Sequence, residues 1–193
     1  MVEHILGKDE VTGSIPVASS STRRPHLVFR SRGAPRGRSV DPHTARALVT
    51  GLTRFPAVVV EEAGILAALP FADPAAETLK QRLLDQALRL GHLDSVALAP
   101  ILAEAGSARL LEGALGGFGK GFSFNRPDTE PAQAQADLRA VIELLGARHE
   151  IAQGLASVSE RLMDDPEAVA EQHRLLLANQ ETTKRLADYS ASD

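Results

Sequence analysis

The string that comes closest to a phosphate-binding motif in this chain is GGFGKGFSF, at residues 116–124. A P-loop needs a glycine, four further residues, Gly-Lys and then a serine or threonine whose hydroxyl binds the magnesium ion. Here Gly121 follows Lys120, and Ala114 stands where the first glycine, which shapes the turn, would belong. Both departures remove groups that the chemistry requires. The string therefore predicts a loop between helices rather than a nucleotide site.

The other polar residues form no recognisable catalytic or metal-binding set. His149 and Glu150 are adjacent, but no second histidine follows at the spacing of a zinc-protease helix. Capping of the following helix explains the acidic group Asp164, Asp165 and Glu167. The chain has no cysteine, which excludes disulfides, cysteine-ligated zinc and a thiol nucleophile. We therefore expect a protein that is not an enzyme by itself, without catalytic residues, metal or cofactor.

Composition favours helices over strands. Hydrophobic residues make up 44% of the 193 residues but aromatic residues only 4%, and alanine and leucine supply most of the apolar mass. Sheets favour β-branched and aromatic residues instead. No apolar run approaches the roughly 20 residues of a membrane span, and residues 1–20 lack a secretory pattern. We expect an all-α protein in the cytoplasm.

Charge divides the chain near residue 40. Residues 1–40 carry seven basic and three acidic side chains, a net charge of +4, whereas the other 14 basic and 22 acidic side chains give residues 41–193 a net charge of −8. A segment so poor in apolar surface cannot offset its ordering entropy, so we expect residues 1–40 to form a disordered basic tail. An alternative function is weak nucleic-acid contact through its arginines, which are Arg23, Arg24, Arg30, Arg32, Arg36 and Arg38.

The origin of this tail is open to a second hypothesis. Residues 11–20 read VTGSIPVASS, and their codons can contain GGTTCGATCCC, the T-arm signature of a transfer-RNA gene. Residues 1–40 would then not be native protein sequence, which the nucleotide sequence can decide.

Helix-start and helix-stop signals divide residues 41–130 into a bundle of five short helices. Aspartates that precede the first turn start helices at Asp41, Asp73 and Asp94, with Glu77 placed for a capping box. The expected helices run from residue 42 to the Phe-Pro break at 55–56, then over 56–69, 74–90, 95–105 and from 107 to about 115. The expected inward side chains are Ala45, Leu48, Val49, Leu52, Val59, Ile65, Leu66, Leu69, Phe71, Leu79, Leu83, Leu84, Ala87 and Leu88.

Residues 131–193 are expected to form a helical hairpin. A first helix of some 30 residues runs over 131–163, and a last helix capped by Asp165 and Pro166 extends to about Tyr189. The early part of the first helix can pack on the bundle, whereas its later part must project and pack on the last helix. Its apolar stripe is Leu138, Val141, Ile142, Leu145, His149, Ala152, Leu155, Val158 and Leu162.

The last helix has more leucine than one packed face can use. Leu175, Leu176 and Leu177 cover most of the circumference within one turn, so one face packs inside the protein and another is left over. An exposed apolar strip marks a protein-binding surface. The predicted partner-binding residues are Val169, His173, Leu175, Leu176, Leu177, Asn179, Gln180, Thr183, Lys184 and Leu186.

These elements resemble the C-terminal helicase-binding domain of bacterial DnaG-type DNA primases over residues 41–193. The resemblance is carried by ARALVTGLTRFPAVVVEEAGILAALPFADPAAETLKQRLLDQALRLGHLDSVALAPIL and by the terminal LLLANQETTKRLA, which contains Asn179, Gln180 and Glu181. It covers a helix, a Phe-Pro break, an acidic helix, the FADP turn, a leucine-rich helix and the late helix.

The resemblance implies a part in DNA replication priming. The bundle would stimulate a DnaB-type replicative helicase, and the hairpin would dock onto the N-terminal domains of that helicase. The chain departs from the whole primase because it lacks cysteine ligands for the zinc-binding domain and has no room for the catalytic Toprim domain. It would then be a truncated primase product without a polymerase site.

Overall fold

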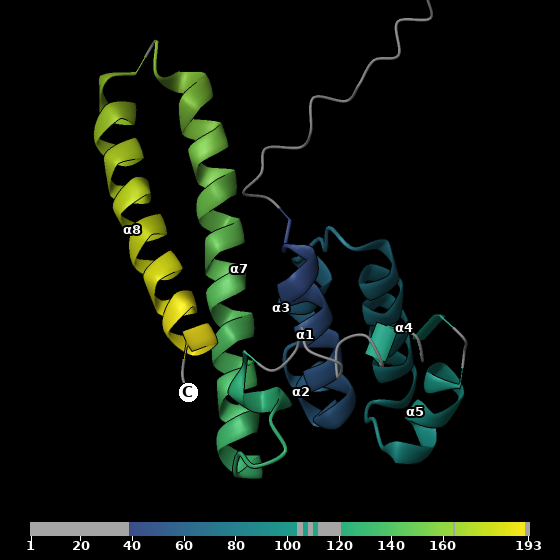
Figure 1. Ribbon diagram of the computed structural model, residues 1–193. Coiled ribbons are helices and arrows are strands. Elements are labelled where there is room, and N and C mark those ends of the chain that lie inside the picture. The colour runs from purple at the N-terminus through teal and green to yellow at the C-terminus, as the bar shows by residue number, and fades with distance from the viewer. Residues whose placement is uncertain (1–38, 104–105, 108–109, 112–120, 164, 192–193) are drawn as a thin grey trace, which may run out of the picture. The chain divides into compact units, whose positions relative to one another are not determined.

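The computed structural model describes residues 39–103, 106–107, 110–111, 121–163 and 165–191 (Figure 1). All regular elements in these ranges are helical, which confirms the predicted all-α fold with a long final helix pair. The expected disordered tail lies outside the described residues except for Ser39 and Val40, as does most of the expected helix from residue 107. The elements are α1 Pro42–Arg54, α2 Pro56–Glu61, α3 Ala63–Ala68, α4 Pro74–Leu90, α5 Ser95–Leu102, the 3-10 turn η2 Ser123–Asn125, α7 Pro131–Arg161 and α8 Pro166–Ala191.

The helix boundaries of the bundle follow local signals. Asp41 Oδ1 accepts hydrogen bonds from the N–H groups of His43 and Thr44, at 3.1 and 3.0 Å, and Asp94 Oδ1 accepts one from Ala97 at 2.8 Å. These bonds satisfy N–H groups that a helix start leaves without partners. At the end of α4, Gly91 takes a φ of 69°, which glycine adopts without steric cost. These predicted boundaries are confirmed.

The expected helix over residues 56–69 is divided at Glu62. Its φ of −103° and ψ of 17° interrupt the helix between α2 and α3. The change of direction lets both short helices pack on α4, so that Val58, Val59 and Leu66 are all fully buried. The prediction of one continuous helix was therefore wrong, because packing on α4 prevails over local propensity.

Helix α4 buries Lys80 and exposes Leu88, the reverse of what residue type suggests. Leu79, Leu83 and Ala87 are buried as predicted, but the side chain of Leu88 is 76% exposed and that of Lys80 only 1% exposed. With about 100° between successive residues, Lys80 falls in the middle of the buried stripe and Leu88 falls beyond its edge. The prediction that Leu88 points inward was wrong because a helix has room for one stripe only.

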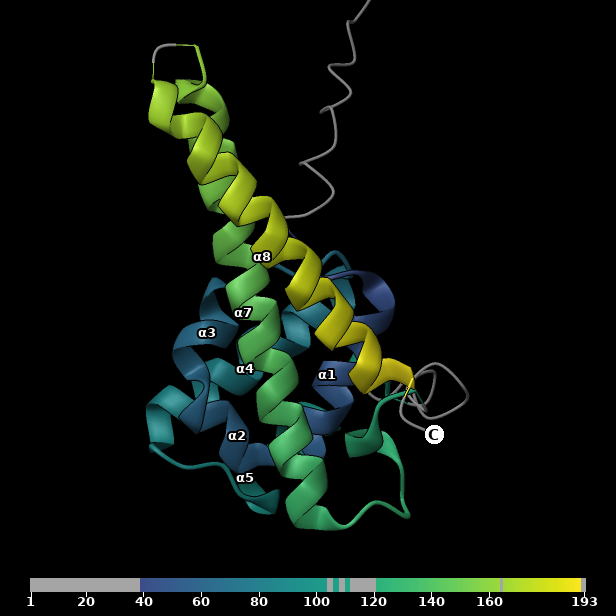
Figure 2. The same cartoon turned by 90° about the vertical axis from the view of Figure 1, so that its left-hand side faces the viewer.

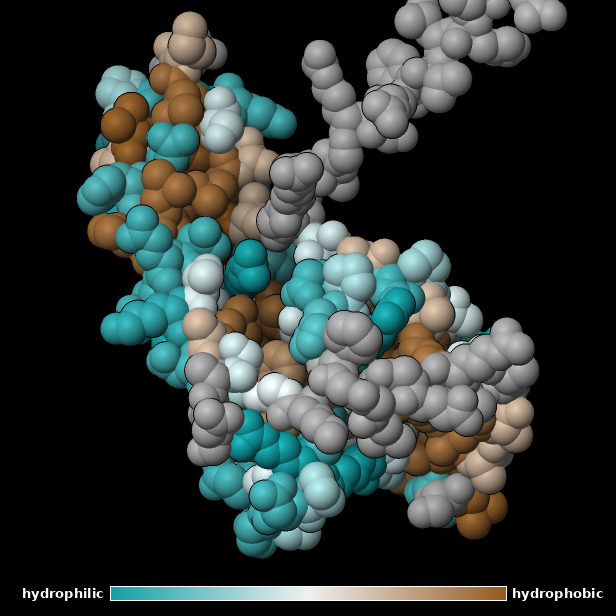
Figure 3. Space-filling view, viewed as in Figure 1, coloured by the Kyte–Doolittle hydropathy of each residue, from teal (hydrophilic) through white to brown (hydrophobic). Residues whose placement is uncertain are grey.

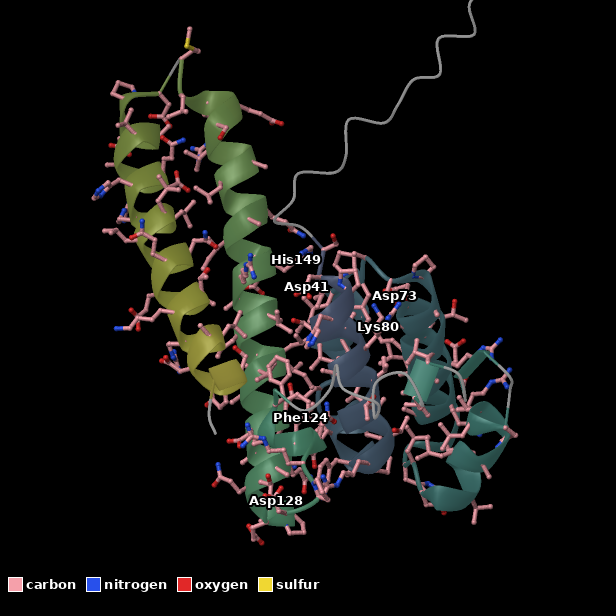
Figure 4. The ribbon with its side chains drawn as sticks, viewed as in Figure 1. Asp41, Asp73, Lys80, Phe124, Asp128 and His149 are labelled. Carbon is pink, nitrogen blue, oxygen red and sulfur yellow. The ribbon has the colours of Figure 1, made fainter. Side chains whose placement is uncertain are left out.

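The buried Lys80 joins the end of α3 to the start of α4. Its ammonium group donates a hydrogen bond to the carbonyl of Leu69, lies 2.9 Å from Glu77 Oε2 and sits 4.6 Å from the centroid of the Phe71 ring. The same Glu77 oxygen accepts the Phe71 N–H at 2.9 Å. The predicted capping box was wrong, because Glu77 stands four residues after the N-cap Asp73 and the box needs an acid at three. Figure 4 labels Lys80 and Asp73 on α4, close together in this corner. A buried charge is tolerated when paired and hydrogen-bonded, and here it has both partners.

The segment after residue 121 is not helical through most of its length, but it is anchored in the core. Phe122 and Phe124 are buried and their rings stack with centroids 5.1 Å apart. Gly51 makes room for them, because a Cβ there would lie 2.8 Å from a ring carbon of Phe124. Arg54 holds the segment by donating to the carbonyls of Phe124 and Arg126, at 3.2 and 2.6 Å. Sequence reasoning predicted a loop here and missed its role in the core.

Helix α7 belongs to the bundle at one end and to the hairpin at the other. Its N-terminal half packs on α1, α2, α3 and η2, and α8 returns antiparallel along it (Figures 1 and 2). This confirms the expectation that the early part of the long helix packs on the bundle and its later part packs on the last helix. The sequence analysis treated residues 41–130 and 131–193 as separate segments. Both belong to one compact unit, Ala34–Asp193.

Val40, which the sequence assigned to the tail, is part of the fold. Its side chain is buried, its N–H donates to the Pro70 carbonyl at 2.8 Å and its carbonyl accepts the Ala72 N–H at 2.9 Å. These bonds form an isolated parallel bridge to Phe71, one of the partners of Lys80. The folded part therefore begins before residue 41.

We predict that a fragment of residues 39–193 folds without residues 1–38, and that a fragment of residues 41–193 is less stable. Loss of the Val40 bridge removes a buried side chain worth about 1.5–3 kcal/mol and two backbone hydrogen bonds. Circular dichroism should show the same helical signal for both fragments but a lower melting temperature for the shorter one. Equal melting temperatures, or the absence of a cooperative transition in the longer fragment, would contradict this.

The acid sensitivity of the bundle follows from Asp73. Burial would raise the pKa of Asp73, but the hydrogen bond from Arg46 Nε, at 2.5 Å, and those from the N–H groups of Ala76 and Ala75 outweigh it and hold the pKa below its ordinary value. Because the folded pKa is the lower one, the stabilising contribution of Asp73 is present above about pH 4 and is lost as the pH falls through the folded pKa.

We predict that Asp73→Ala lowers the free energy of unfolding by about 1–2 kcal/mol at pH 7, and by less at pH 3, which lies below the ordinary pKa of an aspartate, so that part of the charge-based stabilisation is already lost. Asp85→Ala, an exposed position on the same helix, is the control and should change stability by less than about 0.5 kcal/mol. Urea titrations at the two pH values test this. An effect of Asp73→Ala that is independent of pH would be evidence against the charge-based part.

Candidate partner-binding surface

A short turn fixes the start of α8 against the end of α7. Asp165 caps α8, because its Oδ1 accepts the Glu167 N–H at 2.9 Å. Arg161 from the last turn of α7 reaches Asp165 at 3.3 Å and Glu171 on α8 at 2.7 Å. The arginine therefore bridges the two helices at the tip of the hairpin, where Met163 is 93% exposed. Capping by Asp165 is confirmed.

One face of α8 packs inside the protein. Ala168 and Thr182 are buried, while Leu186 and Tyr189 are half-buried and pack against the bundle core. Leu175 is also half-buried and lies over Gly154 of α7, where an added Cβ would come within 3.2 Å of it. The glycine thus creates the space that Leu175 occupies. We call these five residues of α8 the inner face.

The opposite side of α8 carries an exposed apolar strip. Val169, Leu176 and Leu177 are 58%, 45% and 52% exposed, although α8 is an ordered helix. His173, Gln180, Thr183 and Lys184 are exposed beside them and supply a polar border. We call these seven residues the outer strip. Figure 3 shows apolar surface gathered over the projecting half of the hairpin.

The ten predicted partner-binding residues are thus divided between two faces. Seven of them form the outer strip, whereas Leu175 and Leu186 pack on the inner face and Asn179 is half-buried. Leu186 was predicted to lie on the apolar face that is left over for a partner. Its position on the inner face disagrees with that prediction. The reason is geometric: near its C-terminus α8 packs against the bundle core through Leu186, which lines a hollow together with Phe122 and Leu145.

Sequence reasoning missed Met163 as a member of this surface. The sequence analysis placed it at the end of the first long helix, whereas α7 ends at Arg161 and Met163 lies in the turn before α8. An apolar residue in an otherwise acidic turn was the signal that could have found it. Met163 extends the apolar surface from Val169 toward the tip of the hairpin.

The other candidate sites gain no catalytic geometry. The described ranges contain no group of three histidine, cysteine or acidic residues able to hold a metal ion. Most of the phosphate-like string, Asp164 and all the tail arginines lie outside those ranges. His149 contacts Gln153 through its Nε2 at 2.7 Å, and His173 is exposed on the outer strip. The outer strip is thus the best-defined candidate site, and its chemistry is that of protein contact.

Comparison with known proteins adds no further assignment, because no family model, curated protein or solved structure matches the chain. Among the helices that the structure describes, none is both long enough and apolar enough to span a membrane.

We predict that Leu186→Asp and Leu177→Asp have opposite consequences for stability. Leu186→Asp places a charge against the core and should lower the free energy of unfolding by about 1–3 kcal/mol. Leu177→Asp replaces an exposed side chain and should change it by no more than about 0.5 kcal/mol. Thermal unfolding followed by circular dichroism compares the two. If both variants melt like the wild type, the inner and outer faces have been assigned wrongly.

Proposed function

We propose that this protein is a docking module that binds a DnaB-type replicative helicase through the outer strip of α8. The observation that carries the proposal is the exposed apolar strip on an ordered helix. Large apolar side chains cost free energy in water, and a contiguous exposed group of them marks an interaction surface. Val169, Leu176 and Leu177 form such a group. The packing of α8 on the rest of the protein is made by its inner face instead.

The composition of the outer strip supports a protein partner. Interfaces combine an apolar centre with a polar rim, and here three apolar side chains are bordered by His173, Gln180, Thr183 and Lys184. The strip lies on a helix hairpin, whose rigid face suits insertion of apolar anchors into a groove of the partner. Arg161 braces the tip through its pairs with Asp165 and Glu171, so that little order has to be gained on binding.

The resemblance of the sequence to the helicase-binding domain of DnaG-type primases suggests the identity of the partner. That family places a helical bundle before a terminal hairpin, and the same order of elements in this chain supports the assignment. On this proposal the hairpin docks on the N-terminal domains of the helicase and the bundle modulates the helicase. The chain would act in priming through docking alone, without making primers itself.

We predict that Leu176→Asp and Leu177→Asp each weaken helicase binding. Truncation of a buried interface leucine costs about 1–3 kcal/mol, which is roughly five- to 150-fold in affinity, and burial of an unpaired carboxylate adds to that cost. The matched control is Ala178→Asp, which introduces the same group at an exposed position about 200° round the helix from Leu176. Isothermal titration of the full chain against a purified DnaB-type helicase provides the affinities.

The expected pattern is weak binding by both leucine variants and wild-type binding by Ala178→Asp, with unchanged circular dichroism in all three. Wild-type affinity in both leucine variants would refute the outer strip as the contact. No binding of the wild-type chain to the helicase would refute the choice of partner.

A further inference from the structure

Helices α3 and α7 enclose a groove on the bundle that the proposed helicase contact does not use. Its volume is about 460 Å³, within the range of functional pockets. The described residues that line it belong to α3, the turn that follows it and α7, and His149, labelled on α7 in Figure 4, is one of its walls. None of the described residues of α8 lines it, so the groove and the outer strip are separate surfaces.

Small residues give the groove its form. Gly146 on α7 lets the two helices approach, because a Cβ there would lie 2.7 Å from Ile65 Cγ2. Gly64, Ala68 and Ala147 are exposed along the groove and leave its backbone accessible. The accessible apolar surface comes from the half-buried Ile65, with the buried Leu69 beneath it. The groove therefore offers an apolar surface that a side chain of a partner can reach.

Carboxylates border this apolar surface. Glu143 and Glu150 line the groove, are exposed, and lie seven residues apart on α7, which places them on one side of the helix two turns apart. Within the described residues neither makes a hydrogen bond or an ion pair. Arg139, on the same helix, already pairs with Glu61 through its guanidinium. The border thus carries negative charge without a bound cation.

A third carboxylate adds to this charge. Burial raises the pKa of Glu62, and the charges of Glu143 and Glu61 raise it further, against the smaller opposing effect of Arg139. A positive group nearby is Arg148, which lines a neighbouring hollow with Ser39 and Val40. A cation placed between Glu143 and Glu150 would relieve the repulsion around Glu62. A phosphate backbone would be repelled there.

We propose that this groove binds a basic segment of a partner protein, with an arginine or lysine between Glu143 and Glu150 and a neighbouring apolar side chain on Ile65. The occupant is a peptide segment because the groove combines two carboxylates, two helical turns apart, with the apolar surface of Ile65 and small residues beside it. Such a segment presents a cation and an apolar group on one face, as amphipathic helices do. The inference concerns a second surface and does not depend on the helicase proposal.

The test uses the full chain and two synthetic amphipathic peptides of identical Ala-Leu framework, one with arginine and the other with glutamate at the same positions. Fluorescence anisotropy should show binding of the arginine peptide only, and this binding should weaken as the salt concentration rises from about 50 to about 300 mM. The double variant Glu143→Lys/Glu150→Lys should lower the affinity about tenfold, because two attractive pairs become repulsive. Ala147→Phe, which fills the groove, should abolish binding.

Two matched controls separate this groove from other surfaces. Glu160→Lys makes the same charge reversal at an exposed position of α7 away from the groove, and Leu176→Asp alters the outer strip. Both should bind the arginine peptide like the wild type, and circular dichroism should show that every variant is folded.

Four results would overturn the proposal. They are equal binding of the glutamate peptide, unchanged affinity of the double variant, a gain in affinity when the six arginines from Arg23 to Arg38 are replaced by serine, and self-association that the double variant abolishes. The last two would assign the groove to this chain's own basic segment or to a second copy of the chain.

Discussion

The length of α7 is the constraint on which the arrangement of the protein depends. Its 31 residues extend about 46 Å, and apolar side chains lie along most of that length. Leu138, Val141 and Ile142 are buried in the bundle core, but the helices of the bundle contact the N-terminal part of α7 only. Val158 lies well beyond that part and is fully buried nonetheless. It can be buried only because α8 folds back along the projecting half. The hairpin therefore follows from the length of α7, because the part of α7 that extends past the bundle can bury its apolar side chains only against α8.

Inside the bundle, the buried ammonium of Lys80 decides how α3 meets α4. It binds the carbonyl at the end of α3, pairs with Glu77 and lies against Phe71, which in turn bridges to Val40. Another packing of α4 would keep the pair with Glu77, which lies on the same helix, but would cost Lys80 its hydrogen bond to the Leu69 carbonyl and its contact with Phe71. The cluster therefore favours the observed packing of α4 on the end of α3. The neighbouring aspartate, Asp73, has a pKa below its ordinary value because it caps α4 and binds Arg46.

The two faces of α8 differ in what they contact. The inner face is held by the packing of Leu175 over Gly154 and of Leu186 against the bundle core, whereas Leu176 and Leu177 remain in water. Under the proposed function, an outer-strip variant would therefore lose binding and keep its fold. The groove between α3 and α7 has the same property, because its carboxylates are exposed and contribute no buried contact. A module with two such surfaces could hold two partners at once, one apolar and one basic.

The sequence by itself determined those helix boundaries that carry a cap or a break, because such signals act over a few residues: Asp41, Asp94, Gly91 and the turn before Pro166 all behave as their types dictate, whereas the break at Glu62 has no such signal. It also determined that the last helix has one apolar face too many. Only the tertiary structure decided which face that is. Leu175 and Leu176 are chemically identical and differ by about 100° around the axis, so local sequence cannot rank them. Gly154, some twenty residues earlier on α7, makes room for Leu175 and leaves Leu176 outside. For the same reason Lys80 is buried and Leu88 is exposed, since burial is set by the neighbouring helices rather than by the residue type.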